Sequence, residues 1–212
     1  MNSRAIFITA TNTNIGKTYA TLKLIDKLSN IGFKVGVFKP IETGVDDIPK
    51  DAQLLLDRVK KYNNNFKYLT PFDITAYTFK LASAPFCASK DIKIEKILDK
   101  YQELSSLCDI LLIEGAGGLF VPIQEDYFMI DLAQELDAKL LLVTSSGLGT
   151  INNTLLNIEL LHSRDIDFEW SINLYEDIDS FDTVTKPFFD IKFKKFLTLQ
   201  EDMELIVKLL IK

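Results

Sequence analysis

The sequence predicts a doubly wound α/β domain, in which helices cover both faces of a mostly parallel sheet. Two observations predict this fold class. Short β-branched apolar runs alternate along the chain with amphipathic stretches, and Gly-containing turns separate them. Runs such as 110–113 and 140–143 are apolar without interruption, which is typical of strands buried on both faces of a parallel sheet.

The alternation places five strands and five helices. The expected strands cover residues 5–10, 34–38, 109–113, 139–144 and 168–172. The expected helices cover residues 17–31, 50–61, 92–107, 127–136 and 151–163. The segment 180–212 is rich in Phe and Lys, has no Gly-rich turn and ends in a further expected helix at 199–212.

Composition and charge limit the classes of function that the chain can have. The 212 residues carry 24 Lys and Arg against 30 Asp and Glu, a net charge of −6, which argues against binding driven by a nucleic-acid backbone. Neither end resembles a targeting signal, and the apolar run at 5–8 is far shorter than the roughly 20 residues of a membrane span. We therefore expect one catalytic domain over residues 1–212, located in the cytoplasm, with no nucleic-acid or membrane partner.

The segment TNTNIGKT at 11–18 joins the first strand to the first helix. A triphosphate site needs a turn of backbone N–H groups, a helix N-terminus, a lysine for the outer phosphates and a hydroxyl for Mg²⁺. Gly16, Lys17 and Thr18 supply the last three. An ordinary strand–turn–helix connection is the alternative, and Thr13 has an alternative role as a helix cap.

Two further clusters follow the next strands. Lys39 begins the segment KPIETG and should face the same crevice, because parallel strands place ligands at their carboxyl ends. Glu114 begins EGAGG after four apolar residues, and a buried carboxylate there requires a cation or a metal. With the hydroxyl of Thr18 it fits the oxygen ligands of Mg²⁺. Asp51 is either another ligand or a partner of the helix dipole at the start of a helix.

The segment SSGLGTINN at 145–153 forms a fourth turn, between a strand and a helix. Such a helix start favours an anion, for example a substrate carboxylate. A plain strand–helix turn with Thr150 as its cap is equally consistent with the sequence.

With these four motifs in order from about residue 4 to 173, the chain resembles the dethiobiotin synthetase family of the biotin pathway. The loop matches T-x-T-x-x-G-K-T, residues 39–44 match K-P-x-x-[ST]-G, and residues 114–118 match E-G-A-G-G. The later pattern G-x-L-G-x-I-N matches less strictly, with residues 148–152 intact. The resemblance implies ATP- and Mg²⁺-dependent joining of CO2 to 7,8-diaminononanoate by a homodimer, through a carbamate and its mixed anhydride with phosphate.

The resemblance also implies roles for residues at matching positions. Lys17 and Lys39 are the expected catalytic cations. The expected nucleotide-binding residues are Asn14, Ile15, Gly16, Lys17, Thr18 and Tyr19, with Asn173 at the base. The expected Mg²⁺ ligands are Thr18, Asp51 and Glu114. The expected contacts to the diamine or its carbamate are Thr13, Thr43 and Gly117, while Gly149, Thr150, Ile151 and Asn152 of a partner subunit receive the substrate carboxylate.

The chain departs from the family pattern in two places that bear on the site. Ala10 replaces the usual Gly before the loop, so the backbone there must avoid positive φ. The Pro-rich segment that helps to enclose the purine is replaced by KPFF at 186–189, which leaves the base preference open. A partition- or switch-type ATPase of the same fold is the rival interpretation, but such proteins carry a lysine where Asn12 stands.

Overall fold

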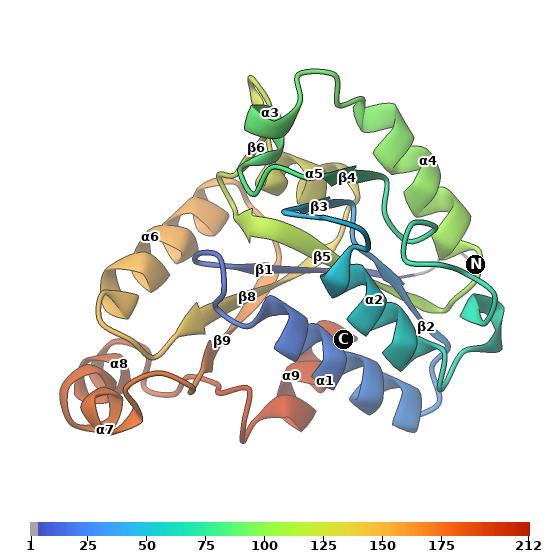
Figure 1. The fold of residues 1–212 in the computed structure, drawn as a ribbon. Coiled ribbons are helices and arrows are strands. Elements are labelled where there is room, and N and C mark those ends of the chain that lie inside the picture. The colour runs from blue at the N-terminus through green and yellow to red at the C-terminus, as the bar shows by residue number, and fades with distance from the viewer. Residues whose placement is uncertain (1–3) are drawn as a thin grey trace.

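The computed structural model describes residues 4–212 and has a five-stranded parallel sheet at its centre (Figure 1). The strand order is β2-β5-β1-β8-β9. The strands are β1 (Arg4–Ala10), β2 (Val35–Phe38), β5 (Ile110–Gly118), β8 (Lys139–Ser145) and β9 (Phe168–Asn173). The predicted fold class is confirmed.

Helices cover both faces of this sheet (Figure 1). On one face lie α1 (Lys17–Asn30), α2 (Lys50–Val59) and α9 (Met203–Leu210). On the other lie α4 (Ile94–Ser105), α5 (Met129–Glu135) and α6 (Thr150–Ser163). Within residues 4–212, no helix combines the length and the apolar character needed to cross a bilayer.

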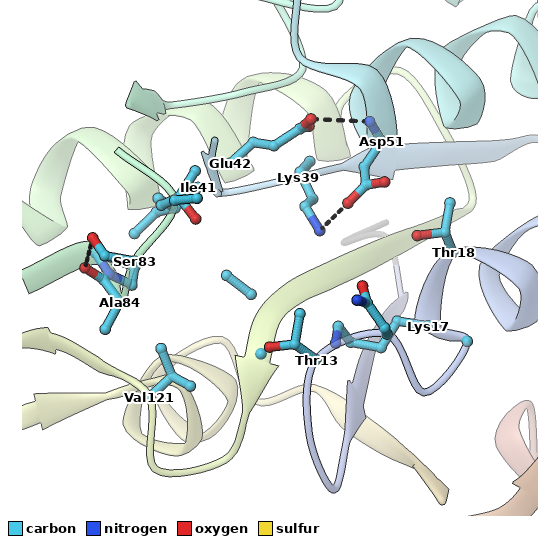
Figure 2. Close-up of a pocket in the computed structure, with 17 residues that line it drawn as sticks. Thr13, Lys17, Thr18, Lys39, Ile41, Glu42, Asp51, Ser83, Ala84 and Val121 are labelled. Carbon is cyan, nitrogen blue, oxygen red and sulfur yellow. Dashed lines mark hydrogen bonds and ion pairs between the residues drawn. The ribbon is translucent and has the colours of Figure 1, made fainter. Parts of the chain in front are cut away.

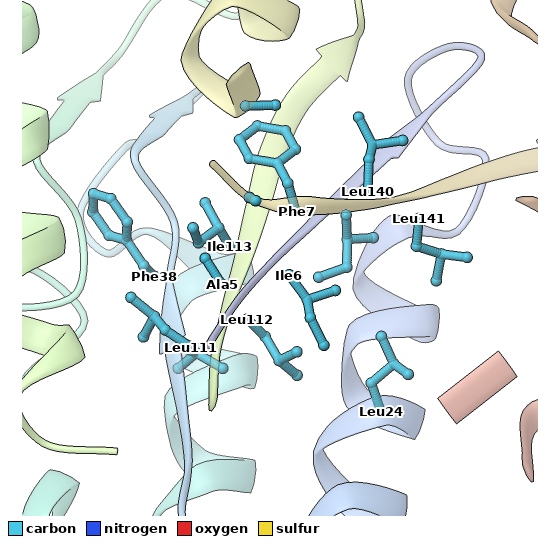
Figure 3. Close-up of a cluster of buried hydrophobic side chains, with 14 of the residues drawn as sticks. Ala5, Ile6, Phe7, Leu24, Phe38, Leu111, Leu112, Ile113, Leu140 and Leu141 are labelled. Carbon is cyan, nitrogen blue, oxygen red and sulfur yellow. The ribbon is translucent and has the colours of Figure 1, made fainter. Parts of the chain in front are cut away.

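The core forms because the apolar strands present successive side chains to opposite faces (Figure 3). Ile6, Leu112 and Leu141 point toward α1, where Leu24 meets them. Phe7 on the same strand as Ile6 points to the opposite face. Side chains on both faces are fully buried, as the uninterrupted apolar runs predict.

Small elements add to the carboxyl edge of the sheet. Strand β3 (Ile41–Thr43) pairs in parallel with β4 (Tyr77–Phe79), and β6 (Pro122–Gln124) pairs antiparallel with β7 (Tyr127–Phe128). The short helix α3 (Pro85–Ala88) follows β4. The 3₁₀ turn η1 (Asn64–Phe66) lies at the opposite, amino edge, where Asn63 donates to the Val35 carbonyl. None of these elements was predicted, because each is only two to four residues long.

Two predicted boundaries were wrong for identifiable reasons. The helix expected at 127–136 begins at Met129, because the two residues before it pair with β6. The strand expected at 109–113 continues to Gly118, so Glu114 lies within it. Ala10, the last residue of β1, pairs with β8 and does not have a positive φ, so an alanine is accommodated there without backbone strain.

The C-terminal segment forms its own apolar cluster on β9. It comprises α7 (Ile178–Ser180), the π-helical turn η2 (Phe181–Thr185) and α8 (Lys186–Phe193). Phe181 and Phe189 are buried against Trp170 and Ile172 of β9. The helix expected at 199–212 is shorter and begins at Met203, after a turn in which the Asp202 carboxylate accepts the Thr198 N–H.

Candidate active site

The loop after β1 has the form that its sequence predicts. Helix α1 begins at Lys17, directly after Gly16, whose φ of 105° lies in the left-handed region that favours glycine. Asn14 also has a positive φ, 60°, which asparagine tolerates better than most residues. The turn therefore brings the N-terminal end of α1 to the carboxyl edge of the sheet, where an anion is favoured.

Side chains fix the shape of this loop by holding its carbonyl groups. Lys17 Nζ donates to the Asn12 carbonyl at 3.2 Å, and the Tyr175 hydroxyl donates to the Asn14 carbonyl at 2.7 Å. Asn173 Nδ2 donates to the Ile15 carbonyl at 3.0 Å. The loop is thus held by Asn173 at the end of β9 and by Tyr175 just after it, both far away in the sequence.

Lys39 and Glu114 meet at the centre of the site. Lys39 Nζ lies 2.7 Å from Glu114 Oε1 and donates to the Gly115 carbonyl. It also lies 3.3 Å from Asp51 Oδ2 (Figure 2). Both Lys39 and Glu114 are buried. The pair satisfies the prediction that a carboxylate in this strand requires a cation.

Two hydroxyl groups of α1 complete the contacts of Glu114. Thr18 Oγ1 donates to Glu114 Oε1 at 3.0 Å. Thr21 Oγ1 lies 2.9 Å from both Glu114 Oε2 and the Lys17 carbonyl. Both carboxylate oxygens of Glu114 therefore accept hydrogen bonds from α1, the helix that follows the phosphate loop.

The two lysines have opposite pKa shifts. Burial and the nearby Lys39 ammonium lower the pKa of Lys17 to about 8. Burial by itself also lowers the pKa of Lys39, but the carboxylates of Glu114 and Asp51 outweigh it and hold that pKa above its ordinary value. Lys39 is therefore firmly charged, whereas Lys17 lacks a carboxylate in contact and is ready to receive an anionic ligand.

Most of the predicted site residues line one cavity of about 690 Å³. They are Thr13, Asn14, Gly16, Lys17, Thr18, Lys39, Thr43, Asp51 and Gly117. Figure 2 shows Lys17 and Thr13 on one side of this space, Lys39 and Asp51 above them, and Ser83, Ala84 and Val121 across it. The cavity can hold an extended polyanion along the loop with a second small molecule beside it.

The donor atoms beside Lys39 suit a hard cation. A hydroxyl from Thr18 and carboxylates from Asp51 and Glu114 are the oxygen ligands that Mg²⁺ prefers, and phosphate oxygens and waters commonly supply its other ligands. Within residues 4–212, no group of three or more His, Cys, Asp and Glu side chains is arranged to hold a metal. The predicted set is compatible with this, since it has two carboxylates.

Other predicted residues do not line the cavity. Glu114 is fully buried and contacts Lys39 and Thr18, which do line it. The Ile15 carbonyl accepts the hydrogen bond from Asn173 that holds the loop, and Tyr19 is exposed on the first turn of α1. Asn173 is already committed on both sides of its amide, since Nδ2 donates to Ile15 and Oδ1 accepts from Gln200 Nε2 at 2.8 Å. A nucleotide base would have to compete with these two bonds to reach it.

The turn at 145–153 is also absent from the lining of the cavity. Gly149 has a φ of 87°, and α6 begins at the next residue. The Thr150 hydroxyl is buried and lies within hydrogen-bond distance of the Ser145 carbonyl and of the Thr144 and Thr154 hydroxyls. The Thr150 hydroxyl is therefore turned away from solvent, while Leu148 and Asn152 of the same turn are exposed.

Sequence reasoning missed three residues that shape the site. Thr21 stands one turn after Lys17, so helical spacing alone places it on the same face. Tyr175 and Glu42 carry no comparable signal, because their partners are distant in the sequence or lie across a loop. Glu42 accepts the backbone N–H groups of Asp51 and Ala52 at 3.0 and 2.9 Å.

Comparisons with known proteins agree with this geometry. The family model described as AAA domain matches residues 4–171. The ATP-dependent dethiobiotin synthetase BioD of Sulfurovum sp. (strain NBC37-1) is 57% identical over 202 residues, which span 94% of this chain and 96% of the relative. The protein of the same name from Wolinella succinogenes is 36% identical over 213 residues and 98% of each chain.

Solved structures match at the level of the fold. A plasmid partition protein from Borrelia burgdorferi superimposes with a TM-score of 0.62 at 10% identity, covering 100% of this chain and 99% of that one. A MinC:MinD cell division protein complex from Aquifex aeolicus matches with a TM-score of 0.54 at 19% identity, covering 97% of this chain and 85% of that one. Such low identities establish a shared architecture only.

Proposed function

The chain belongs to the ATP-dependent dethiobiotin synthetase family, and from this premise we propose that it uses ATP to join CO2 to both amines of 7,8-diaminononanoate, closing a ureido ring. The observation that carries the proposal is the contact of the buried Glu114 with Lys39 and Thr18, which both line the cavity beside the phosphate loop. These groups suit the transfer of a phosphoryl group between two anions.

The proposed reaction has three steps. One amine attacks CO2 and loses a proton, which gives a carbamate. A carbamate oxygen then attacks the γ-phosphorus of ATP, the bond to the β-phosphate oxygen breaks, and ADP leaves with the electron pair. The second amine attacks the carbonyl carbon of this mixed anhydride and loses a proton as the bond to phosphate breaks, so phosphate is released. No enzyme nucleophile is required, and catalysis depends on positioning and charge.

The lysines supply the charge in this scheme. Lys17 exchanges its bond to the Asn12 carbonyl for phosphate oxygens, which favours its charged form. Lys39 stays charged between Glu114 and Asp51 and offsets the charge of the transferring phosphoryl group. Thr13, Thr43 and Gly117 line the cavity where the diamine and its carbamate would lie.

We assign a Mg²⁺ site to Thr18, Asp51 and Glu114, where the cation would offset the charge of the β- and γ-phosphate oxygens. The support is the chemistry of these donors and their place around Lys39. A cation that enters this space would compete with Lys39 for the carboxylates of Asp51 and Glu114.

We further propose a homodimer in the cytoplasm, in which residues 149–152 of one subunit bind the substrate carboxylate at the site of the other. Two observations support this arrangement. The turn does not line the cavity of its own subunit, and Leu148 beside it is fully exposed. An exposed apolar side chain next to a helix N-terminus suits a site completed by a second copy.

The rival ATPase function has no specific observation in its favour. The structural likeness to partition and cell division proteins is confined to the fold, and fold alone does not assign function. Asn12 also stands where the loops of those proteins carry a lysine.

A phosphate-release assay tests the proposed function. The full chain is incubated with nucleotide, Mg²⁺ and bicarbonate, with and without 7,8-diaminononanoate, and the assay is repeated with ATP, GTP and CTP. We expect phosphate release that requires both the diamine and Mg²⁺, together with one ring-closed product per phosphate. Equal release without the diamine would support the switch-type ATPase instead.

A further inference from the structure

Glu42 holds the start of helix α2 from a different element of the fold. It lies on β3, its side chain is 7% exposed, and its two carboxylate oxygens accept the N–H groups of Asp51 and Ala52. The residue before the helix is Pro49, whose side chain has no atom that could accept a hydrogen bond. A carboxylate from another strand therefore binds two N–H groups that the helix itself leaves without a partner.

This contact controls where the side chain of Asp51 lies. Figure 2 shows Glu42 reaching the backbone nitrogen of Asp51 while the Asp51 carboxylate turns to Lys39, 3.3 Å away. The connection from β3 to α2 is held at Val45, which is buried and donates its N–H to the Phe79 carbonyl, whereas residues 46–48 next to the helix are exposed. Two direct contacts therefore join the first turn of α2 to the segment that carries Lys39: the hydrogen bonds of Glu42 and the ion pair between Asp51 and Lys39.

We propose that Glu42 is a positioning residue, which fixes the first turn of α2 so that the Asp51 carboxylate faces Lys39 and the cation bound beside it. The inference rests on the proposed function, because Asp51 is a Mg²⁺ ligand only in that function. A direct contact between Glu42 and the diamine is the competing role, since Glu42 also lines the cavity.

The helix itself does not depend on this contact. Ala52, Leu55, Leu56 and Val59 are fully buried and anchor α2 in the core. Replacing Glu42 should therefore loosen the first turn and leave the fold in place. A glutamine retains one acceptor oxygen, so Glu42→Gln should have a smaller effect than Glu42→Ala.

The experiment measures binding and rate separately in the full chain. Calorimetry follows a non-hydrolysable ATP analogue at increasing Mg²⁺ concentrations, and steady-state assays give kcat and the KM of the diamine. The control is Asp109→Ala, which removes a carboxylate bond to the Lys34 N–H at the opposite end of the sheet. Circular dichroism and thermal unfolding report the fold of each variant.

We expect Glu42→Ala to raise the Mg²⁺ concentration for half-maximal analogue binding and to lower kcat, each by about 10- to 100-fold, as for other residues that orient metal ligands. Glu42→Gln should fall between this variant and the wild type, and Asp109→Ala should change neither quantity. Added to Asp51→Ala, Glu42→Ala should cause little further loss, because both act through the same carboxylate.

Three results would overturn the inference. They are an unchanged Mg²⁺ dependence in a folded Glu42→Ala variant, a full additional loss when it is combined with Asp51→Ala, or a change confined to the KM of the diamine. A wild-type chain that binds the Mg²⁺–analogue complex but shows no diamine-dependent reaction would refute the proposed function alone, because the binding measurement still decides the role of Glu42.

Discussion

Two turns at the carboxyl edge of the sheet share their local form and differ in their surroundings. One leads from β1 into α1 and the other from β8 into α6, and each helix starts after a glycine of positive φ, Gly16 or Gly149. A Cβ atom on Gly16 would lie 2.2 Å from Asn173 Nδ2, whereas a Cβ atom on Gly149 would have nothing within 4 Å.

The comparison shows that a turn of this kind, with a glycine of positive φ before a helix, does not by itself form a binding site. Around Gly16, the side chains of Asn173 and Tyr175 of the same chain hydrogen-bond to the loop, and the loop lines a cavity. This turn therefore has the surroundings that a phosphate site needs. Around Gly149 it supplies an exposed Leu148 and hydroxyls that point inward. The second turn is thus left open by its own chain, which is the basis for proposing a dimer.

The largest expected effect tests the enclosed turn. Lys39→Ala should lower turnover by on the order of 10²-fold or more, because it removes a charge that offsets the transferring phosphoryl group. It also leaves Glu114 buried without its cation. Steady-state phosphate release measures the effect, and calorimetry of nucleotide binding is the control for an intact loop. Turnover at the wild-type rate would remove Lys39 from the reaction.

Matched glycine substitutions compare the two turns directly. Gly149→Ala should cost only the strain of a left-handed alanine, about 1–2 kcal/mol. Gly16→Ala should cost more, because its methyl group also displaces the Asn173 amide from the Ile15 carbonyl. Denaturant unfolding gives the two free energies, and in an Asn173→Ala background the excess at Gly16 should shrink. Equal losses in both glycine variants would contradict the distinction.

The open turn is tested by adding charge. Leu148→Asp should shift the chain from dimer to monomer and raise the KM of the diamine, because a charged side chain opposes burial at an interface. Sedimentation velocity measures the oligomeric state. Tyr68→Asp is the control. Tyr68 is also exposed, but it comes shortly after Asn63, which contacts the amino end of β2, at the opposite edge of the sheet from Leu148. A wild-type assembly that is already monomeric and active would refute the shared site.

The last prediction concerns proton binding by Lys17. Its pKa is lowered to about 8, so between pH 8 and its ordinary value the unfolded chain holds a proton that the folded chain has released. Lys17 therefore destabilises the ligand-free protein most below pH 8, and this effect fades as the pH rises. Lys17→Met should raise Tm at pH 7 more than at pH 10. Thermal scans of the exposed Lys61→Met control should show no such trend.

The fold class and the phosphate loop could be predicted from the sequence because both depend on local patterns. Apolar runs, glycine turns and helical spacing are properties of neighbouring residues, and they placed Lys17 and Thr18 at the start of α1 correctly. The rule that parallel strands share one carboxyl edge then brought Lys39 and Glu114 together, as the structure has them.

Tertiary structure alone decided which polar groups hold the site in shape. Asn173 and Tyr175 reach the loop across about 160 residues, and Glu42 meets α2 only because β3 and the loop after it fold back. No periodicity encodes such contacts, because they depend on strand order and on packing between distant segments. Local sequence thus specifies the reactive side chains at the carboxyl edge of the sheet. Tertiary packing specifies that the turn at Gly16 is surrounded by other parts of the chain and that the turn at Gly149 is left open.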